Sequence, residues 1–180
     1  RFALNGVWWG GAPARAGGGP YLRPAPPTGR FQSMAMAPLT FRAASLARLP
    51  AAARWLLAHA AGRAAVLFTG EMGAGKTTLV RALAAELGVT DHVSSPTYGL
   101  VHTYRTAAGT ALYHFDLYRL ADAREALDLG IFDYLDEPGA LSLIEWPERL
   151  GPLLPDVAAG ACSLTIAVDP ADESRLLTLV

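Results

Sequence analysis

Cysteine, lysine and long apolar runs are what this 180-residue sequence has least of. Its one cysteine, Cys162, cannot form an internal disulfide, which excludes a disulfide-stapled secreted scaffold and favours a reducing compartment. The longest apolar runs, at 55–61 and 64–68, are far shorter than a membrane span. A net charge of −1 gives no overall field that would attract nucleic acid. These absences predict a cytoplasmic protein that uses neither a membrane nor DNA.

Charge and composition divide the chain near residue 34. Residues 1–33 carry four arginines and no acidic residue, together with seven glycines and five prolines. Such a segment lacks apolar periodicity and cannot offset its own chain entropy. We therefore predict a disordered extension over 1–33, either upstream sequence or non-native, and a folded domain over 34–180. A transit peptide or a nucleic-acid arm is the alternative reading of the extension.

Apolar patterning predicts the elements of the folded domain. It predicts strands at 39–43, 64–69, 98–104, 111–117, 140–145, 162–168 and 175–180. It predicts helices that run from the capping residue Ser45 through Leu56, over 76–87, and over 123–129 after the capping residue Asp122. Strands and helices alternate first and a β-rich end follows, which indicates an α/β domain with a largely parallel sheet.

A glycine-rich loop lies between a predicted strand and a predicted helix. Gly70, Glu71, Met72, Gly73, Ala74, Gly75, Lys76 and Thr77 fit the pattern G-x-x-x-x-G-K-[ST], and Thr78 follows. Glycines there let successive backbone N–H groups surround a phosphate, and the positive end of the helix adds to the attraction. We expect Lys76, the only lysine, to reach the β- and γ-phosphates, and the Thr77 hydroxyl to bind Mg²⁺. The loop predicts that the protein binds a nucleoside triphosphate.

The loop alone does not identify the reaction. A guanine-reading Asn-Lys-x-Asp motif is absent because the only lysine lies in the loop, and the Leu-Ser-Gly-Gly signature of transporter ATPases is absent too. These absences leave a small-molecule kinase or an ATPase that drives an assembly. The later arginines are scattered rather than clustered as in a kinase lid, which favours the ATPase. A nucleotide-gated binding module with incidental hydrolysis is a third alternative.

Two carboxylates end predicted strands beside the loop. Asp116 is the candidate Walker B residue that holds Mg²⁺, and a helix or turn cap is its alternative role. Glu145 could orient water or complete the metal shell. Trp146, the next residue, is equally compatible with stacking on adenine and with half-buried packing.

Three more polar residues have side chains that could take part in a site. Thr97 follows Pro96, which presents it on a loop, where it could sense the γ-phosphate or belong to an ordinary turn. His102 and His114 have no Cys or His at metal-site spacing. We therefore interpret both histidines as packing or surface residues.

Four motifs taken together resemble a known family. They are Gly-Glu-Met-Gly-Ala-Gly-Lys-Thr-Thr-Leu at 70–79, Ser-Pro-Thr-Tyr-Gly-Leu-Val at 95–101, Tyr-His-Phe-Asp-Leu-Tyr-Arg-Leu at 113–120 and Ile-Glu-Trp-Pro-Glu-Arg at 144–149. In this order and spacing they resemble the TsaE (YjeE) family, bacterial ATPases needed to make threonylcarbamoyladenosine in tRNA. The resemblance covers residues 39–169, and it departs at 71–72, where Asp-Leu is commoner than Glu-Met.

The resemblance implies a fold, an activity and partners. The family fold is a single P-loop NTPase domain with a sheet of mixed direction. The family's phosphate, metal, switch and base positions correspond here to Lys76, Thr77, Thr97, Asp116, Glu145 and Trp146. Family members bind and hydrolyse ATP with Mg²⁺ and act with the TsaB–TsaD pair, through which tRNA takes part indirectly. In that pair TsaD transfers the threonylcarbamoyl group that TsaC makes.

Overall fold

The computed structural model describes residues 37–96 and 99–180. The extension predicted over 1–33 lies outside the described residues, as does Thr97. None of the helices in the described ranges is long and apolar enough to cross a membrane.

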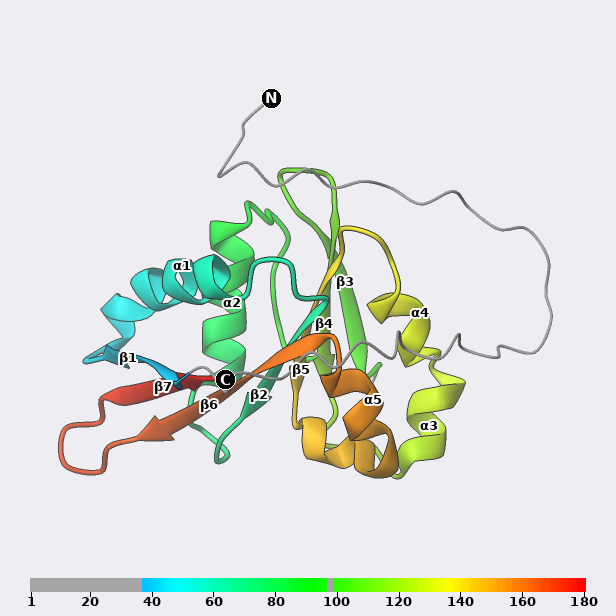
Figure 1. Cartoon of the computed structure of the whole chain (residues 1–180). Helices are drawn as coiled ribbons and strands as arrows, with labels where there is room; N and C mark the ends of the chain where they lie inside the picture. The colour runs from blue at the N-terminus through cyan, green and yellow to red at the C-terminus, as the bar shows by residue number, and fades with distance from the viewer. Residues whose placement is uncertain (1–36, 97–98) are drawn as a thin grey trace. The chain divides into compact units, whose positions relative to one another are not determined.

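One mixed sheet forms the centre of the domain (Figure 1). Its strands in the described residues are β1 Leu39–Ala43, β2 Ala65–Thr69, β3 Val101–Arg105, β4 Ala111–Asp116, β5 Leu141–Glu145, β6 Ala161–Val168 and β7 Arg175–Leu179, in the order β1-β7-β6-β2-β5-β4-β3. The four inner strands, β6, β2, β5 and β4, are mutually parallel. The pairs β1–β7, β6–β7 and β3–β4 are antiparallel. The α/β class and the mixed sheet are confirmed.

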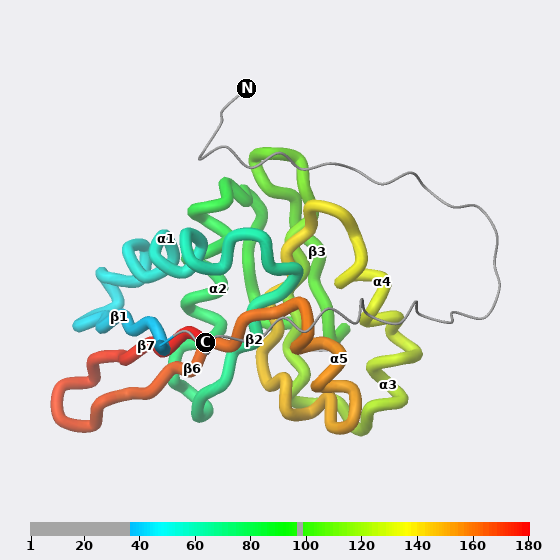
Figure 2. Tube along the Cα trace, in the orientation of Figure 1, coloured from blue at the N-terminus to red at the C-terminus, as the bar shows by residue number. Residues whose placement is uncertain are grey.

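Helices cover both faces of the sheet (Figures 1 and 2). The α-helices are α1 Leu49–His59, α2 Lys76–Glu86, α3 Ala123–Asp128, α4 Ile131–Leu135 and α5 Leu154–Ala158, and the 3₁₀ segments are η1 Leu46–Arg48 and η2 Pro147–Leu153. Helices α1 and α2 pack on one face, and α3, α4, η2 and α5 pack on the other. The inner strands therefore have both faces covered, as parallel strands require.

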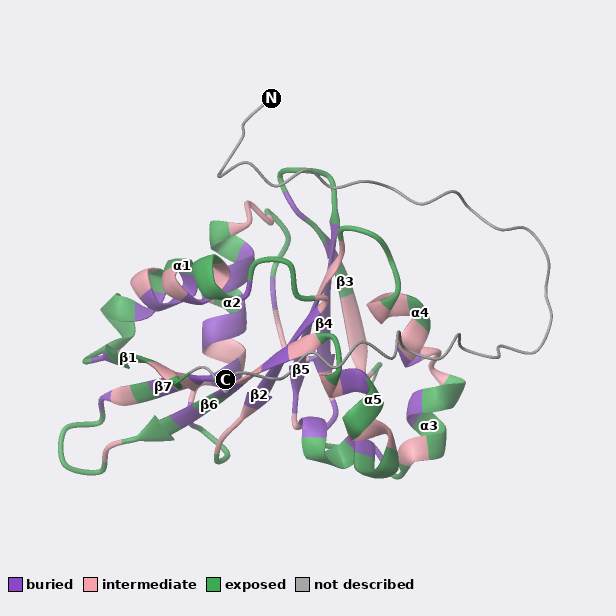
Figure 3. Ribbon diagram, in the orientation of Figure 1, coloured by how far each residue is buried: buried purple, intermediate pink, exposed green. Residues whose placement is uncertain are grey.

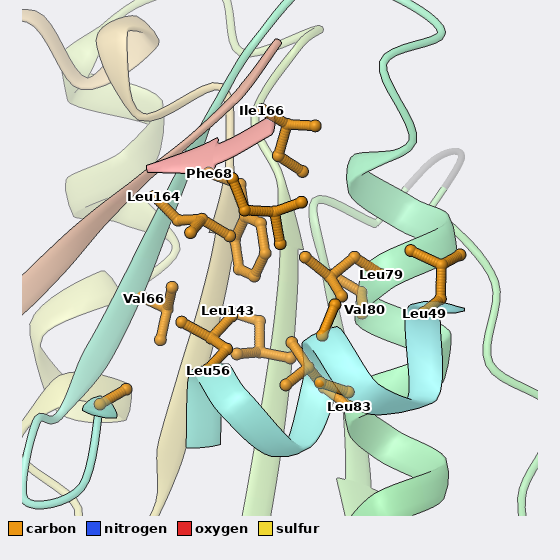
Figure 4. Close-up of a cluster of buried hydrophobic side chains, with 14 of the residues drawn as sticks. Leu49, Leu56, Val66, Phe68, Leu79, Val80, Leu83, Leu143, Leu164 and Ile166 are labelled. Atoms are coloured by element: carbon orange, nitrogen blue, oxygen red, sulfur yellow. The ribbon is translucent and has the colours of Figure 1, made fainter. Parts of the chain in front are cut away.

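The buried side chains follow this division into two clusters. On the first face, Leu56 of α1 and Leu83 of α2 pack against Val66, Phe68 and strand residues beside them (Figure 4). On the second face, Ile144 of β5 and Phe115 of β4 pack against Ile131 and its helical neighbours. Figure 3 shows the inner strands buried and the outer helix surfaces exposed. Two separate cores hold the inner strands rigidly between them, so their ends provide a firm base for a site.

The first helix differs from its prediction. Ser45 precedes the short η1 segment and makes no side-chain capping bond to a described residue. Helix α1 begins later, at Leu49, and extends to His59, because Pro50 fits only within a first turn. The prediction for Asp122 is confirmed, since its carboxylate accepts the backbone N–H groups of Arg124 and Glu125 at the start of α3. Helices α4 and α5 and the η2 segment were not predicted, because their length of five to seven residues gives little periodicity.

Strand register decides which side chains meet. Strand β5 lies between β2 and β4, so that Glu145 is paired with Phe68 on one side and with Asp116 on the other. The carboxyl ends of these three parallel strands share one edge of the sheet, and the loop after β2 begins there. In open α/β sheets this edge is where ligands bind.

Candidate functional site

Glycine geometry shapes the loop over 70–75 that joins β2 to α2. Gly70, Gly73 and Gly75 have φ angles of 146°, 80° and 103°, a region that other residues rarely adopt. A Cβ on Gly70 would lie 2.6 Å from the Ile166 carbonyl oxygen, so the start of the loop has no room for a side chain. Gly75 is the N-cap of α2 and offers no side-chain oxygen. The first N–H groups of α2 therefore lack a capping side chain and are available to an anion.

Lys76 lies at the start of α2, with only 5% of its surface exposed. Its Nζ donates hydrogen bonds to the carbonyl oxygens of Gly70 at 2.7 Å and Glu71 at 2.9 Å. The same Nζ lies 3.8 Å from the centre of the Trp146 ring. Burial lowers the pKa of Lys76, although nearby carboxylates, Glu145 first among them, act in the opposite direction. The loop, the lysine and the tryptophan form one contiguous cluster.

Glu145 is 2% exposed and receives three hydrogen-bond contacts. The Thr77 hydroxyl lies 2.8 Å from Oε1 and 3.1 Å from Oε2, and it donates to this carboxylate. The Nε2 atom of His114, on β4, lies 2.8 Å from Oε1. The predicted metal residues Thr77 and Glu145 are therefore in direct contact.

Asp116 ends β4 next to Glu145 and is held by two donors. Its Oδ2 accepts a hydrogen bond from the Ser95 hydroxyl, and its Oδ1 accepts the Tyr118 backbone N–H at 3.2 Å. The second bond makes Asp116 a local turn cap, the alternative role that the sequence left open. The carboxylate also lines the pocket described below, so the two roles are compatible.

Trp146 has a left-handed backbone, with a φ of 59° and a ψ of 50°. Successive strand residues point to opposite faces, and this conformation ends the alternation directly after Glu145. Both side chains consequently reach the same pocket. The Tyr118 ring lies 5.0 Å from the Trp146 ring, and the Arg149 guanidinium lies 5.6 Å from the Tyr118 ring. Trp146 is half-buried, so the structure is compatible with both packing and stacking on a base.

A pocket of about 590 Å³ opens over these groups. It is lined by Met72, Gly73, Gly75, Lys76, Thr77, Thr78, Ser95, Pro96, Leu100, Asp116, Tyr118, Arg119, Glu125, Glu145 and Trp146. Of the predicted binding residues, Gly70 and Glu71 contribute carbonyl acceptors to Lys76 rather than lining. Ala74, also within the loop, is buried, and its carbonyl oxygen accepts a hydrogen bond from Arg175 at 3.3 Å.

Three residues of this cluster were not predicted as site residues. His114 is not a surface residue and does more than pack, because it contacts Glu145. Ser95 and Tyr118 lie in the motifs already quoted, but the hydrogen bond of Ser95 to Asp116 and the tilted ring contact of Tyr118 with Trp146 depend on loop geometry. The alternation along β4 was the available signal for His114, since it places residues 114 and 116 on the same face.

The oxygen ligands of the site fit Mg²⁺ bound together with a nucleotide better than a metal ion held by protein side chains alone. Within 37–96 and 99–180, no group of three or more His, Cys, Asp or Glu side chains is arranged to hold a metal. Mg²⁺ usually takes one or two carboxylates together with phosphate oxygens and water. Thr77, Asp116 and Glu145 match that incomplete set, and the adjacent loop offers N–H donors for the phosphates.

Comparison with known proteins gives consistent relatives. The family described as "Threonylcarbamoyl adenosine biosynthesis protein TsaE" matches residues 43–176. The chain is 41% identical to the tRNA threonylcarbamoyladenosine biosynthesis protein TsaE of Haemophilus influenzae over 64% of its own length and 68% of the relative. It is 44% identical to the protein of that name from Synechocystis over 50% of this chain, but spans only 57% of that relative.

A solved structure supports the fold independently. The crystal structure of Bacillus subtilis YdiB superposes with a TM-score of 0.59 at 24% identity, covering 79% of this chain and 84% of that one. Identity at that level shows a common fold alone. The family match, in contrast, covers most of the chain and includes the loop, both acids and Trp146. The chain belongs to the TsaE family.

Proposed function

We propose that this protein is a Mg²⁺-dependent ATPase that supports threonylcarbamoyladenosine modification of tRNA together with TsaB and TsaD. One observation carries the proposal: in a member of the TsaE family, Thr77 hydrogen-bonds Glu145 beside a glycine-rich loop and Asp116. We further propose that it acts in the cytoplasm and that tRNA takes part through the partner complex. The protein names of the relatives support the pathway, and the pocket supports the nucleotide.

The chain's own residues suit hydrolysis at a terminal phosphate. In that reaction a water oxygen bonds to the γ-phosphorus and gives up a proton to the released phosphate or to solvent, while the bridging P–O bond breaks and its electron pair leaves with ADP. Backbone N–H groups of the loop and the Lys76 ammonium would stabilise the negative charge that develops. Most of the catalytic effect is expected from this stabilisation. Lys76 would exchange its two carbonyl acceptors for phosphate oxygens.

Thr77, Asp116 and Glu145 would hold Mg²⁺. The metal, when bound, would supply positive charge that stabilises the developing negative charge of the phosphates. Glu145 would also orient the attacking water. In this proposal the carboxylates of Asp116 and Glu145 would serve the metal, and the buried ammonium of Lys76 would serve the phosphates.

The test is phosphate release measured in three settings. The purified chain is assayed alone, with small-molecule acceptors, and with TsaB and TsaD, and Lys76→Ala serves as the inactive control. Release that rises with TsaB–TsaD supports the proposal. Transfer to an acceptor would identify a kinase instead. Nucleotide binding without release in any setting would identify a nucleotide-gated binding module.

A further inference from the structure

A buried histidine lies beneath the carboxylate of Glu145. His114 is fully buried on β4, and its Nε2 lies 2.8 Å from Glu145 Oε1. Its Nδ1 has no hydrogen-bond partner among the described residues. Packing alone does not explain a histidine here, because its same-face neighbour Leu112 and its register partner Leu143 are fully buried apolar residues. A leucine would satisfy that core without leaving a ring nitrogen unpaired.

The donor and the acceptor of this bond can be assigned. An ionised carboxylate only accepts hydrogen bonds, so the proton must lie on His114 Nε2. A neutral ring then has an unprotonated Nδ1, which leaves one buried acceptor unpaired. The opposite tautomer would set two acceptors 2.8 Å apart and would also bury an unpaired N–H. Of the two neutral tautomers, the one with its proton on Nε2 therefore leaves fewer groups unpaired.

The bond fixes the direction of the carboxylate. Glu145 ends β5, and its Oε1 lies within 2.8 Å of both the Thr77 hydroxyl and His114 Nε2, which come from different elements. Thr77 approaches from α2, on the side of the loop, and His114 approaches from β4. A carboxylate held by hydrogen bonds from two elements keeps one rotamer. The Thr77 hydroxyl has a single proton to share between the two oxygens, so by itself it does not fix how the carboxylate is rotated.

We propose that His114 is a positioning residue that holds the Glu145 carboxylate toward Thr77 and the glycine-rich loop. Groups that hydrogen-bond a metal-binding or reacting side chain commonly change activity or metal affinity by about 10- to 100-fold when removed. The inference rests on the proposed function for its kinetic consequence. The hydrogen bond itself can be tested without nucleotide or metal.

The first experiment reads the ring nitrogens of the free protein. Uniformly ¹⁵N-labelled histidine is introduced, and long-range ¹H–¹⁵N correlations distinguish the tautomers of the four histidines. The His114 signals are assigned by their absence in His114→Gln. We expect a proton on Nε2 that exchanges slowly with water. A proton on Nδ1 with a bare Nε2 would overturn the proposal.

The second experiment compares two variants with a matched control. His114→Leu removes the donor, whereas His114→Gln retains an N–H near the Nε2 position. Ser142→Ala is the control, because Ser142 on β5 is also fully buried and its hydroxyl has no partner among the described residues. We expect turnover to fall about 10- to 100-fold in His114→Leu, to recover largely in His114→Gln and to stay unchanged in the control.

Binding separates positioning from general damage. The affinity for ATP without Mg²⁺, measured by calorimetry, should be similar in all four proteins, because His114 does not line the pocket. Turnover in His114→Leu equal to that of the unmodified protein would refute the positioning role. Failure of the unmodified protein to hydrolyse ATP, both alone and with TsaB and TsaD, would instead refute the proposed function, and the ring-nitrogen measurement would still decide the hydrogen bond.

Discussion

Gly70, the residue where β2 passes into the glycine-rich loop, gives the sharpest stability prediction. A Cβ added there would lie 2.6 Å from the backbone oxygen of Ile166, and φ is 146°. Because the obstacle is backbone in the neighbouring strand β6, it cannot rotate away as a side chain would. Gly62 provides a matched control, since its φ of 82° is also unfavourable but a Cβ there meets no described atom within 4 Å.

The expected magnitudes follow from these two environments. Gly62→Ala carries backbone strain alone, roughly 1–2 kcal/mol. Gly70→Ala adds the steric overlap, for a total of roughly 2–5 kcal/mol. At about 2–4 °C per kcal/mol, the melting temperature should fall by roughly 4–20 °C in Gly70→Ala and by roughly 2–8 °C in Gly62→Ala.

Thermal unfolding followed by circular dichroism, without nucleotide, measures both variants under the same conditions. Nucleotide is left out because a change in binding would shift the melting temperature by itself. The reasoning is refuted if the two variants melt together, since the overlap with Ile166 would then cost nothing. It is also refuted if Gly70→Ala melts at the temperature of the unmodified protein.

Four further predictions concern the site and a surface turn. Lys76→Ala should reduce ATP hydrolysis by at least about 100-fold in a phosphate-release assay, and normal turnover would exclude its phosphate role. Asp116→Asn and Glu145→Gln should abolish hydrolysis without changing the circular dichroism spectrum, and normal hydrolysis at limiting Mg²⁺ would leave that acid a structural role only. Trp146→Ala should weaken nucleotide binding by roughly 5- to 150-fold in an equilibrium titration, with a smaller loss in Trp146→Phe, and unchanged affinity would make the ring a packing residue. Hydrogen bonds from Ser174 and then Arg42 lower the pKa of Asp172 from 3.8 to about 2. The stabilisation that its charge gives should therefore disappear as pH falls from about 4 through 2. In thermal unfolding across that window, the melting temperature of Asp172→Asn should depend less on pH than that of the unmodified protein.

The sequence allowed the end of each inner strand to be predicted, and with it most of the site. Glu145 and Asp116 close apolar runs, and parallel strands bring such ends to one edge. The glycine-rich loop is equally local, because its geometry depends on eight consecutive residues. Predicting these features requires only that the strands run parallel, and not which strands are neighbours in the sheet.

Contacts between strands could not be predicted, because they depend on strand order and register. His114 meets Glu145 only because β4 lies directly beside β5 with residues 116 and 145 paired. A shift of one residue would turn His114 to the opposite face of the sheet. Trp146 differs, because Pro147 after it makes a turn plausible, whereas its left-handed φ of 59° is uncommon for a bulky residue and could not be predicted.

The hydrogen bonds already present among the charged groups of the site affect how tightly the site can bind a nucleotide. Lys76 donates to two loop carbonyls, Glu145 accepts from Thr77 and contacts His114, and Asp116 accepts from Ser95. Each of these three side chains is therefore already hydrogen-bonded within the protein. On the proposed function, binding phosphate would exchange the two Lys76 bonds for others rather than add to them, which would reduce the net gain. On the proposed function we therefore expect the chain alone to bind nucleotide weakly, and a partner that favours the exchanged arrangement would raise the affinity by shifting that population.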